Sequence, residues 1–180
     1  ATYHCDTGSQ ITAAEETFCT GEPGWMCTIC QDVLSGHLLA ENECKKCGIY
    51  TGKYGENLTW ALVDGTLTIS GTGKMYNWNS ASKIPWYGYR EMIKTVVLEE
   101  GVSSIGNYAF YKCSSLTSIT IPDSVTSIGD YAFNGCSSLS SAIIGNGVIS
   151  IGEYAFDNCS KLTSVTIGNS VTSIEYYAFH

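Results

Sequence analysis

Charged side chains are scarce in this sequence: Asp, Glu, Lys and Arg together make up 14% of its 180 residues. Only nine of them are Lys or Arg, these are scattered along the chain, and the formal net charge is −8. Proteins that bind nucleic acids carry a basic patch or stripe, so this class is excluded. No apolar run reaches eighteen residues, which excludes a membrane-spanning helix within this sequence, and no signal peptide is visible.

Catalytic motifs are absent as well. The sequence contains no HExxH, GxSxG, Walker, GxGxxG or EF-hand pattern. The acidic pair Glu99-Glu100 could supply an acid and a base, but it follows a predicted strand where the chain turns, which is typical of a solvated rim. Hydrophobic residues make up 44% of the chain, enough to build a core. We therefore expect a folded protein that is not an enzyme.

Cysteine and charge are unevenly distributed and divide the chain into three segments. Residues 1–52 have a net charge of −5, residues 53–91 of +1 and residues 92–180 of −4. The first segment also holds six of the nine cysteines. We predict that these segments are a Cys-rich head, a lead-in and a repeat region.

A 23-residue repeat dominates the last segment. The motif Ser-Ile-Gly-x-Tyr-Ala-Phe begins at Ser104, Ser127 and Ser150, and it returns in altered form at Ser173. A fixed period of this length indicates a solenoid, in which each coil buries its apolar face against its neighbours. The sequence stops inside a repeat at His180, so we expect either further coils in a longer protein or another copy covering this end. The strictest columns are Ala109/Ala132/Ala155/Ala178, Phe110/Phe133/Phe156/Phe179, Leu116/Leu139/Leu162 and Ile121/Ile144/Ile167.

Each repeat unit contains the spacing of a leucine-rich repeat, seen as Leu116-x-x-Ile119-x-Ile121. Ile119 and Ile121 alternate with Ser118 and Thr120, a period of two that predicts a short strand with its apolar side inward.

The rest of the unit is predicted to be extended over 125–128 and to form a short helical turn over 130–136. The column that usually carries Asn or Cys in leucine-rich repeats reads Gly101, Ser124, Gly147 and Ser170, so this is an atypical class of the repeat. The predicted fold is a β-rich leucine-rich-repeat solenoid with short strands and short helical turns.

The units at Cys113–Pro122 and Ser124–Cys136 resemble the BspA-type leucine-rich repeats of bacterial cell-surface proteins. The preceding Gly55–Met75, followed by Ile84-Pro85-Trp86, is similar to the segment that often leads into them. The resemblance covers roughly residues 55–180. It implies a secreted or wall-attached protein, extracellular or on the cell surface, that acts in adhesion or protein binding.

The lead-in has the pattern of a β-hairpin. Apolar residues alternate over 58–62 and again over 67–69, with the turn signal Asp64-Gly65 between them. A solenoid needs its first apolar face covered by an atypical terminal segment, so we expect an N-terminal hairpin cap. Counting back 23 residues places Trp86 in the Ala column, so a degenerate coil is predicted to begin near Pro85.

The head carries two CxxC pairs, Cys27-x-x-Cys30 and Cys44-x-x-Cys47, separated by thirteen residues. Four thiolates in two such turns can close a tetrahedral zinc site, and zinc would then supply much of the stability of this short segment. We therefore favour a zinc-ribbon-like head whose ligands are these four cysteines. Disulfides are the alternative, and they are favoured if the protein is exported. Six cysteines allow 15 pairings, and the sequence does not choose among them.

The other cysteines have separate predictions. Cys5 and Cys19 can pair with each other, or His4 or His37 can join a metal. The three repeat cysteines fall 23 residues apart, at Cys113, Cys136 and Cys159. Neighbouring coils would bring their thiols within disulfide range, but three is an odd number and free cysteine is among the most buried residue types. We therefore expect three buried thiols.

The functional prediction falls on the outward side chains of the repeat strands, because a solenoid presents them as one continuous surface. This face is uncharged and rich in hydroxyls, and it lacks the Trp, Tyr and Arg anchors of tight interfaces. We expect it to bind a protein or a glycan, and the alternative is a structural spacer within a larger surface protein. The predicted ligand-binding residues are Thr95, Val97, Ser118, Thr120, Ser141, Ile143, Ser164 and Thr166.

Overall fold

The structure is a computed structural model that describes residues 2–4, 10–12, 26–27, 32–33, 39–40, 43–44, 49–55 and 57–180, with side chains from residue 50 onward. The chain divides into two compact units. One comprises residues 1–52 and 61–64, and the other comprises residues 53–60 and 65–180.

The first unit contains short antiparallel strands. β1 pairs with β2, β3 pairs with β4, and β6 pairs with both β5 and β7. Their bounds are β1 Thr2–His4, β2 Gln10–Thr12, β3 Met26–Cys27, β4 Asp32–Val33, β5 Leu39–Ala40, β6 Glu43–Cys44 and β7 Ile49–Lys53.

The predicted hairpin is present as β8 (Leu58–Val63) and β9 (Thr66–Gly71). Asp64 and Gly65 form its turn with φ of 49° and 78°, the two positive values that a type I′ turn requires. Alternate strand residues are buried, as the sequence pattern predicted. The chain then passes through β10 (Gly73–Lys74) and two 3₁₀ helices, η1 (Ala81–Lys83) and η2 (Tyr87–Met92).

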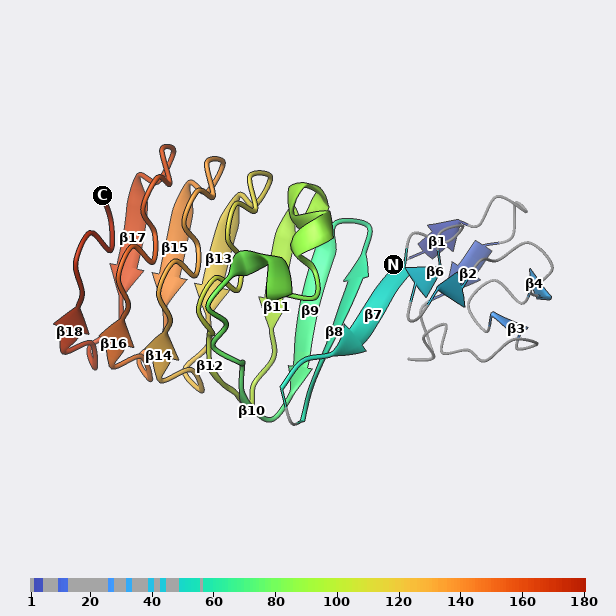
Figure 1. Ribbon diagram of the computed structural model, residues 1–180, viewed down its shortest axis with the longest axis horizontal. Helices are drawn as coiled ribbons and strands as arrows, with labels where there is room; N and C mark the ends of the chain where they lie inside the picture. The colour runs from blue at the N-terminus through green and yellow to red at the C-terminus, as the bar shows by residue number, and fades with distance from the viewer. Residues whose placement is uncertain are drawn as a thin grey trace. The chain divides into compact units, whose positions relative to one another are not determined.

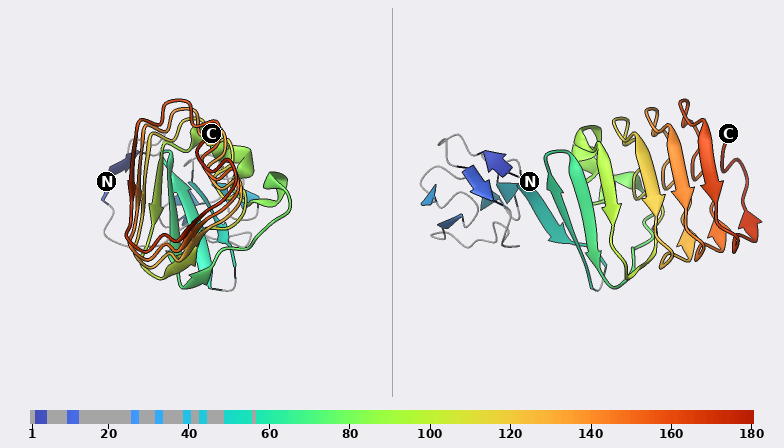
Figure 2. Two further views of the ribbon diagram at one scale, coloured as in Figure 1. Left: turned by 90° about the vertical axis from the view of Figure 1, so that its left-hand side faces the viewer. Right: turned by 180° about the vertical axis from the view of Figure 1, so that it is seen from behind.

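The repeats form coils that lie one behind another, with nearly the same outline when viewed along the stack (Figures 1 and 2). One side of the stack is a parallel sheet of β13, β15 and β17, and a second parallel sheet contains β14, β16 and β18. The register advances by 23 residues at each pairing. The bounds are β11 Thr95–Leu98, β12 Val102–Ser104, β13 Ser118–Ile121, β14 Ser127–Ile128, β15 Ser141–Ile144, β16 Ser150–Ile151, β17 Ser164–Ile167 and β18 Ser173–Ile174.

The prediction of a helical turn over 130–136 was wrong. Backbone N–H groups there donate alternately to the next coil and within their own coil: Phe133 donates to the Ala155 carbonyl at 2.7 Å, and Asn134 donates to the Tyr131 carbonyl at 3.2 Å. Half of the donors are thus committed to the neighbouring coil, so a continuous helix cannot form. Tyr131 takes a positive φ of 57°, and the same backbone recurs in each coil. We call this part of the coils, with its equivalents at 107–113, 153–159 and 176–180, the turn side.

The core is built from the strict columns. Phe110, Phe133 and Phe156 are buried and stack at 5.1 and 4.9 Å between ring centroids. Ala132 and Ala155 are fully buried beside them and accept the inter-coil hydrogen bonds, so a side chain larger than methyl has no room. The columns therefore record a close approach of coils on the turn side.

In the first coil a tryptophan fills the position that a phenylalanine has in the later coils. Register places Trp86 in the Ala column, but its indole stacks on Phe110 at 6.0 Å and donates from Nε1 to the Ala109 carbonyl at 2.7 Å. The ring thus occupies the place of a Phe, because η2 replaces the regular turn. Tyr87, which register assigns to the Phe column, is only half-buried.

Candidate functional site

The predicted face is exposed on the strands of the coils. In β13 the buried residues Ile119 and Ile121 alternate with exposed Ser118 and Thr120, so the predicted facing is confirmed. Of the eight predicted residues, seven are exposed and Ser141 is half-buried. The apolar members Val97 and Ile143 are 41% and 50% exposed, which is unusual for β-branched aliphatic side chains.

The strand register brings six of the eight residues into two rows. One row runs Ser118, Ser141, Ser164, and the other runs Thr120, Ile143, Thr166. These rows are adjacent side chains on one flat sheet, so a ligand could span three coils.

The remaining two predicted residues belong to a different sheet. β11 pairs in parallel with β9, which sets Thr95 beside Thr66 and Val97 beside Thr68. Sequence reasoning missed the two β9 residues because a hairpin was expected to cover the stack and not to extend its surface. The signal was present, since Thr66 and Thr68 alternate with buried residues exactly as the repeat hydroxyls do.

A seam therefore separates β11 from β13, which approach each other without forming a ladder. In the next pair of coils, the Gly145 N–H donates to the Ile121 carbonyl at 2.9 Å. The equivalent position in β13's coil is Pro122, which has no N–H to give to Leu98. Pro122 therefore lacks one of the hydrogen bonds that join neighbouring coils elsewhere in the stack.

The face offers hydrogen bonding without charge. The hydroxyls of Ser118, Thr120, Ser164 and Thr166 form no hydrogen bond with any other residue that the structure describes. Hydroxyls elsewhere on the coils are engaged, for example Thr126, which donates to the Ser103 carbonyl at 3.0 Å. The strand rows are therefore free to exchange water for ligand groups, and they contain no nucleophile, acid or base suited to catalysis.

The predicted zinc ligands fall largely outside the described residues. Cys30 and Cys47 are not described, and Cys27 and Cys44 are described only as positions on β3 and β6. Cys5 and Cys19 also lie outside the described residues. Within the described part of the chain, no three His, Cys, Asp or Glu side chains come together as a metal site.

The repeat cysteines are free and buried, as predicted. The thiols of Cys136 and Cys159 lie 3.2 and 3.3 Å from the carbonyl oxygens of Phe110 and Phe133, to which they can donate weak hydrogen bonds. Burial raises the pKa of Cys113 to about 12, opposed by the Arg90 charge, and raises the pKa of Cys136 well above its ordinary value. These thiols therefore stay protonated and unreactive at neutral pH.

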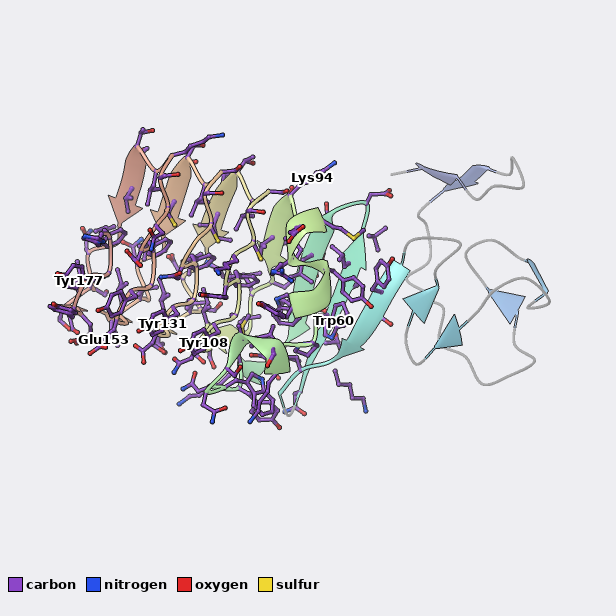
Figure 3. The ribbon with its side chains drawn as sticks, turned by 45° about the horizontal axis from the view of Figure 1, so that its top comes forward. Trp60, Lys94, Tyr108, Tyr131, Glu153 and Tyr177 are labelled. Carbon is purple, nitrogen blue, oxygen red and sulfur yellow. The ribbon has the colours of Figure 1, made fainter. Side chains whose placement is uncertain are left out.

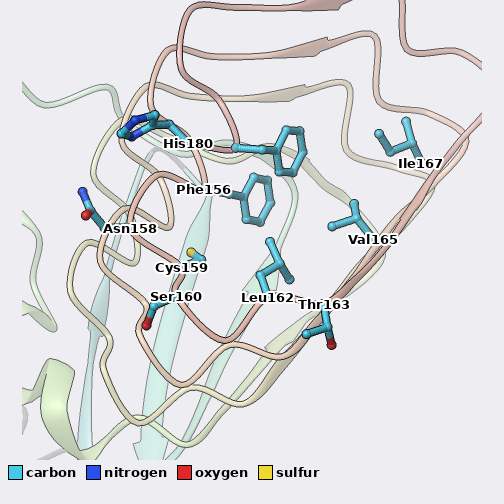
Figure 4. Close-up of a pocket in the computed structure, with 10 residues that line it drawn as sticks. Phe156, Asn158, Cys159, Ser160, Leu162, Thr163, Val165, Ile167 and His180 are labelled. Atoms are coloured by element: carbon cyan, nitrogen blue, oxygen red, sulfur yellow. The ribbon is translucent and has the colours of Figure 1, made fainter.

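A hollow of about 550 Å³ lies at the last coil (Figure 4). Phe156, Leu162 and Val165 contribute to its lining, together with the half-exposed Phe179 and the thiol of Cys159. These belong to the same columns that are fully buried in the preceding coils. The hollow is thus a continuation of the core columns at the last coil, and the polar residues Asn158, Ser160, Thr163 and His180 also line it.

A stack of coils with a parallel β-sheet along one side, a 23-residue register and a core of Leu, Ile and Phe defines a leucine-rich-repeat solenoid. The model of the BspA type leucine rich repeat region matches residues 79–180 in six copies. The chain belongs to this family. No curated protein matches it.

Two solved structures with TM-scores above 0.5 share the fold. A leucine-rich repeat protein from Eubacterium ventriosum is 31% identical with a TM-score of 0.57, and the match covers 71% of this chain and 40% of that one. The T. pallidum leucine rich repeat protein is 24% identical with a TM-score of 0.51, covering 71% and 66%. A leucine rich cell surface protein from Faecalibacterium prausnitzii is 26% identical with a TM-score of 0.40, covering 72% and 45%. The chain thus spans less than two thirds of the length of each of these proteins.

None of the helices in the part of the chain that the structure describes is long and apolar enough to cross a membrane.

Proposed function

We propose that this protein is a non-enzymatic module, extracellular or on the cell surface, that binds a protein or glycan through the outward strand face. The observation that carries the proposal is the pair of rows Ser118–Ser141–Ser164 and Thr120–Ile143–Thr166, which are exposed, uncharged and mostly without internal hydrogen bonds. Membership of a repeat family whose arrays present extended binding surfaces supports it.

The test is binding of the purified chain to a panel of immobilised glycans and extracellular proteins. Ile143→Lys places a charge in the middle of the face. It should weaken binding to any panel member that the wild type binds by at least about tenfold, because a charge buried without a partner at an interface is costly. Ser137→Lys is the matched control, because Ser137 is exposed outside the strands. Equal binding by both variants would remove the strand face from the proposal.

The alternative function is a structural spacer. It is supported by the absence of large aromatic or Arg anchors among the eight face residues and by the continuous hydrogen bonding between coils, which makes the stack stiff. A chain that binds nothing in the panel but unfolds cooperatively would favour this alternative.

We also propose that residues 53–91 cap the first coil. Support comes from Trp86, whose ring covers Phe110, and from β9, which hydrogen-bonds along the free edge of β11. Trp86→Ala should expose Phe110 and lower the unfolding free energy by about 3–5 kcal/mol, as other large-to-small core substitutions do. Chemical denaturation of the variant and the wild type measures this.

The zinc-ribbon-like head remains a proposal that rests on the spacing of Cys27, Cys30, Cys44 and Cys47. If it is correct, one equivalent of zinc copurifies and a chelator releases four reactive thiols while the repeats stay folded. A metal-free protein whose non-reduced mass shows bonded cysteines would establish disulfides instead.

A further inference from the structure

The repeats contain two Asn-Gly pairs, Asn134-Gly135 and Asn146-Gly147, and the fold surrounds them differently. Asparagine is chemically labile, because the backbone nitrogen of the next residue can attack its side-chain amide carbon. Glycine as the next residue favours this attack, since it has no Cβ to obstruct it and its backbone is free to rotate. In a folded protein the reaction therefore depends on whether the attacking N–H and the side-chain amide are held in other contacts.

The first pair is held on the turn side. Asn134 is only 8% exposed, and its Nδ2 donates a hydrogen bond to Asp157 Oδ2 at 2.8 Å. The Gly135 N–H, which would have to attack, donates to the Asp157 carbonyl at 2.9 Å. Figure 3 shows this side of the coils, where Tyr131 and Tyr177 stand in one row. Both the attacking group and the leaving group of this pair are thus occupied.

The second pair lies in residues 145–149, which connect β15 to β16 and which we call the corner. Asn146 is exposed, and its Nδ2 forms no hydrogen bond with any residue that the structure describes. The Gly147 N–H also has no acceptor in the described part of the chain. The attacking group and the leaving group of this pair are therefore both free.

The fold also polarises the carbon that would be attacked. In the following coil the Asn169 N–H donates to Asn146 Oδ1 at 3.2 Å. The Asn146 N–H in turn donates to Asp123 Oδ1 at 2.6 Å, so the residue is positioned from both neighbouring coils. A donor at a carbonyl oxygen stabilises the negative charge that this oxygen gains during nucleophilic attack. The bond from Asn169 therefore favours the reaction and leaves the amide nitrogen of Asn146 available to depart.

The corner has no room for additional backbone atoms. A Cβ added at Gly147 would overlap the carbonyl oxygen of Asp123 in the preceding coil. Packing thus requires glycine at this position. The same close approach makes the corner sensitive to any change in the length of the main chain.

We propose that Asn146 is a site of spontaneous deamidation in the folded protein and that its isoaspartate product loosens the corner. The Gly147 nitrogen bonds to Asn146 Cγ and gives up its proton, the Cγ–Nδ2 bond breaks, and ammonia leaves with that proton. Water then opens the resulting succinimide. Opening at Cγ gives aspartate, and opening at the main-chain carbonyl carbon gives isoaspartate. Water is the only other reactant, and the inference does not rest on the proposed function.

The two products should differ in their effect on stability. Aspartate keeps an oxygen that can accept from the Asn169 N–H, as Asp123 already does for the Asn146 N–H. Isoaspartate inserts a methylene into the main chain next to Gly147, where the coils approach closely. We therefore expect the fold to tolerate aspartate and to be weakened by isoaspartate.

The test ages the full chain in mildly alkaline buffer and follows both Asn-Gly pairs by peptide mass spectrometry, with fragmentation that distinguishes aspartate from isoaspartate. In the folded chain Asn146 should react at least about tenfold faster than Asn134. The matched control is the same chain in denaturant, where both pairs lose their contacts and their rates should agree within about threefold. Equal rates at Asn134 and Asn146 in the folded chain would overturn the site.

The effect on the corner is measured by thermal unfolding of fresh and aged protein. Asn146→Asp represents the aspartate product and should unfold close to the fresh wild type, whereas the aged wild type should unfold at a lower temperature. Asn146→Gln closes the ring far more slowly and should lose no stability over the same time, which assigns the loss to this residue. Aged wild type as stable as Asn146→Asp, or an equal loss on ageing in Asn146→Gln, would overturn the loosening.

Discussion

The two sides of each coil are held together by the same kind of interaction but impose different demands on the sequence. On the strand side, outward positions accept Ser, Thr, Val or Ile, because a pleated strand requires only that alternate residues face inward. On the turn side, Tyr-Ala-Phe recurs without change in four coils, because the Tyr and Phe rings stack from coil to coil and the coils approach closely at Ala. Strict repetition therefore marks steric constraint, and the variable positions are the ones available for binding.

The largest difference between the sides should come from the core beneath the turn. Phe133 is fully buried between Phe110 and Phe156, so Phe133→Ala should lower the unfolding free energy by about 3–5 kcal/mol. Thr120→Ala on the strand side should cost less than about 0.5 kcal/mol. Urea denaturation of both variants measures the contrast, and equal losses would refute the assigned facing.

The regular part of this contrast could be predicted from sequence because the 23-residue period fixes the register. Once Ile119 and Ile121 were placed inward, the rows through Ser141 and Ile143 followed, since each coil repeats its predecessor. Periodicity says nothing of how a non-repeating segment packs, so the stacking of the Trp86 ring in the Phe column was not foreseen. A single sequence also does not distinguish a helical turn from the alternating hydrogen bonds of the turn side.

The candidate site was only partly accessible to the same reasoning. Six of the eight face residues share a sheet, but Thr95 and Val97 lie across a seam. Pro122 contributes to the seam, because its missing N–H, which could have been read from the sequence, removes one hydrogen bond across it. The exchange of Asn and Asp within one hydrogen-bonded column becomes visible only with coordinates.

A second effect concerns the thiols buried behind the turn side. An unfolded chain releases a thiol proton above about pH 8.5, whereas the folded chain holds the Cys113 proton to about pH 12. The contribution of each buried thiol to the unfolding free energy should therefore be fully present below about pH 8.5. Between about pH 8.5 and pH 12 it should fall by about 1.4 kcal/mol per pH unit for each thiol. Cys136→Ala should reduce the slope by that amount in denaturation curves at pH 9, 10 and 11. An unchanged slope would mean that Cys136 titrates in the folded protein.

A third effect tests the left-handed backbone of the turn side. Gly135 has a φ of 73°, and an added Cβ would lie 3.0 Å from the Lys112 side chain, so Gly135→Ala should cost about 1–2 kcal/mol. Lys112 occupies the same column with a φ of 56°, a conformation that Asn tolerates better and that Asn158 already adopts. Lys112→Asn should therefore stabilise the protein by up to about 1 kcal/mol. Thermal unfolding shows whether the two substitutions act in opposite directions.

The smallest expected effect separates structural from functional reasons for charge on the turn side. Asp130→Asn preserves an oxygen that can accept from the Glu153 N–H and removes a charge next to Glu153, so the unfolding free energy should change by less than about 0.5 kcal/mol, with any change toward greater stability. Asp130→Ala removes the acceptor and should cost about 1 kcal/mol. Matched denaturation curves at low and high salt measure both. A loss for Asp130→Asn as large as that for Asp130→Ala would show that the link needs a carboxylate, and the acidity of this position would then have a structural cause.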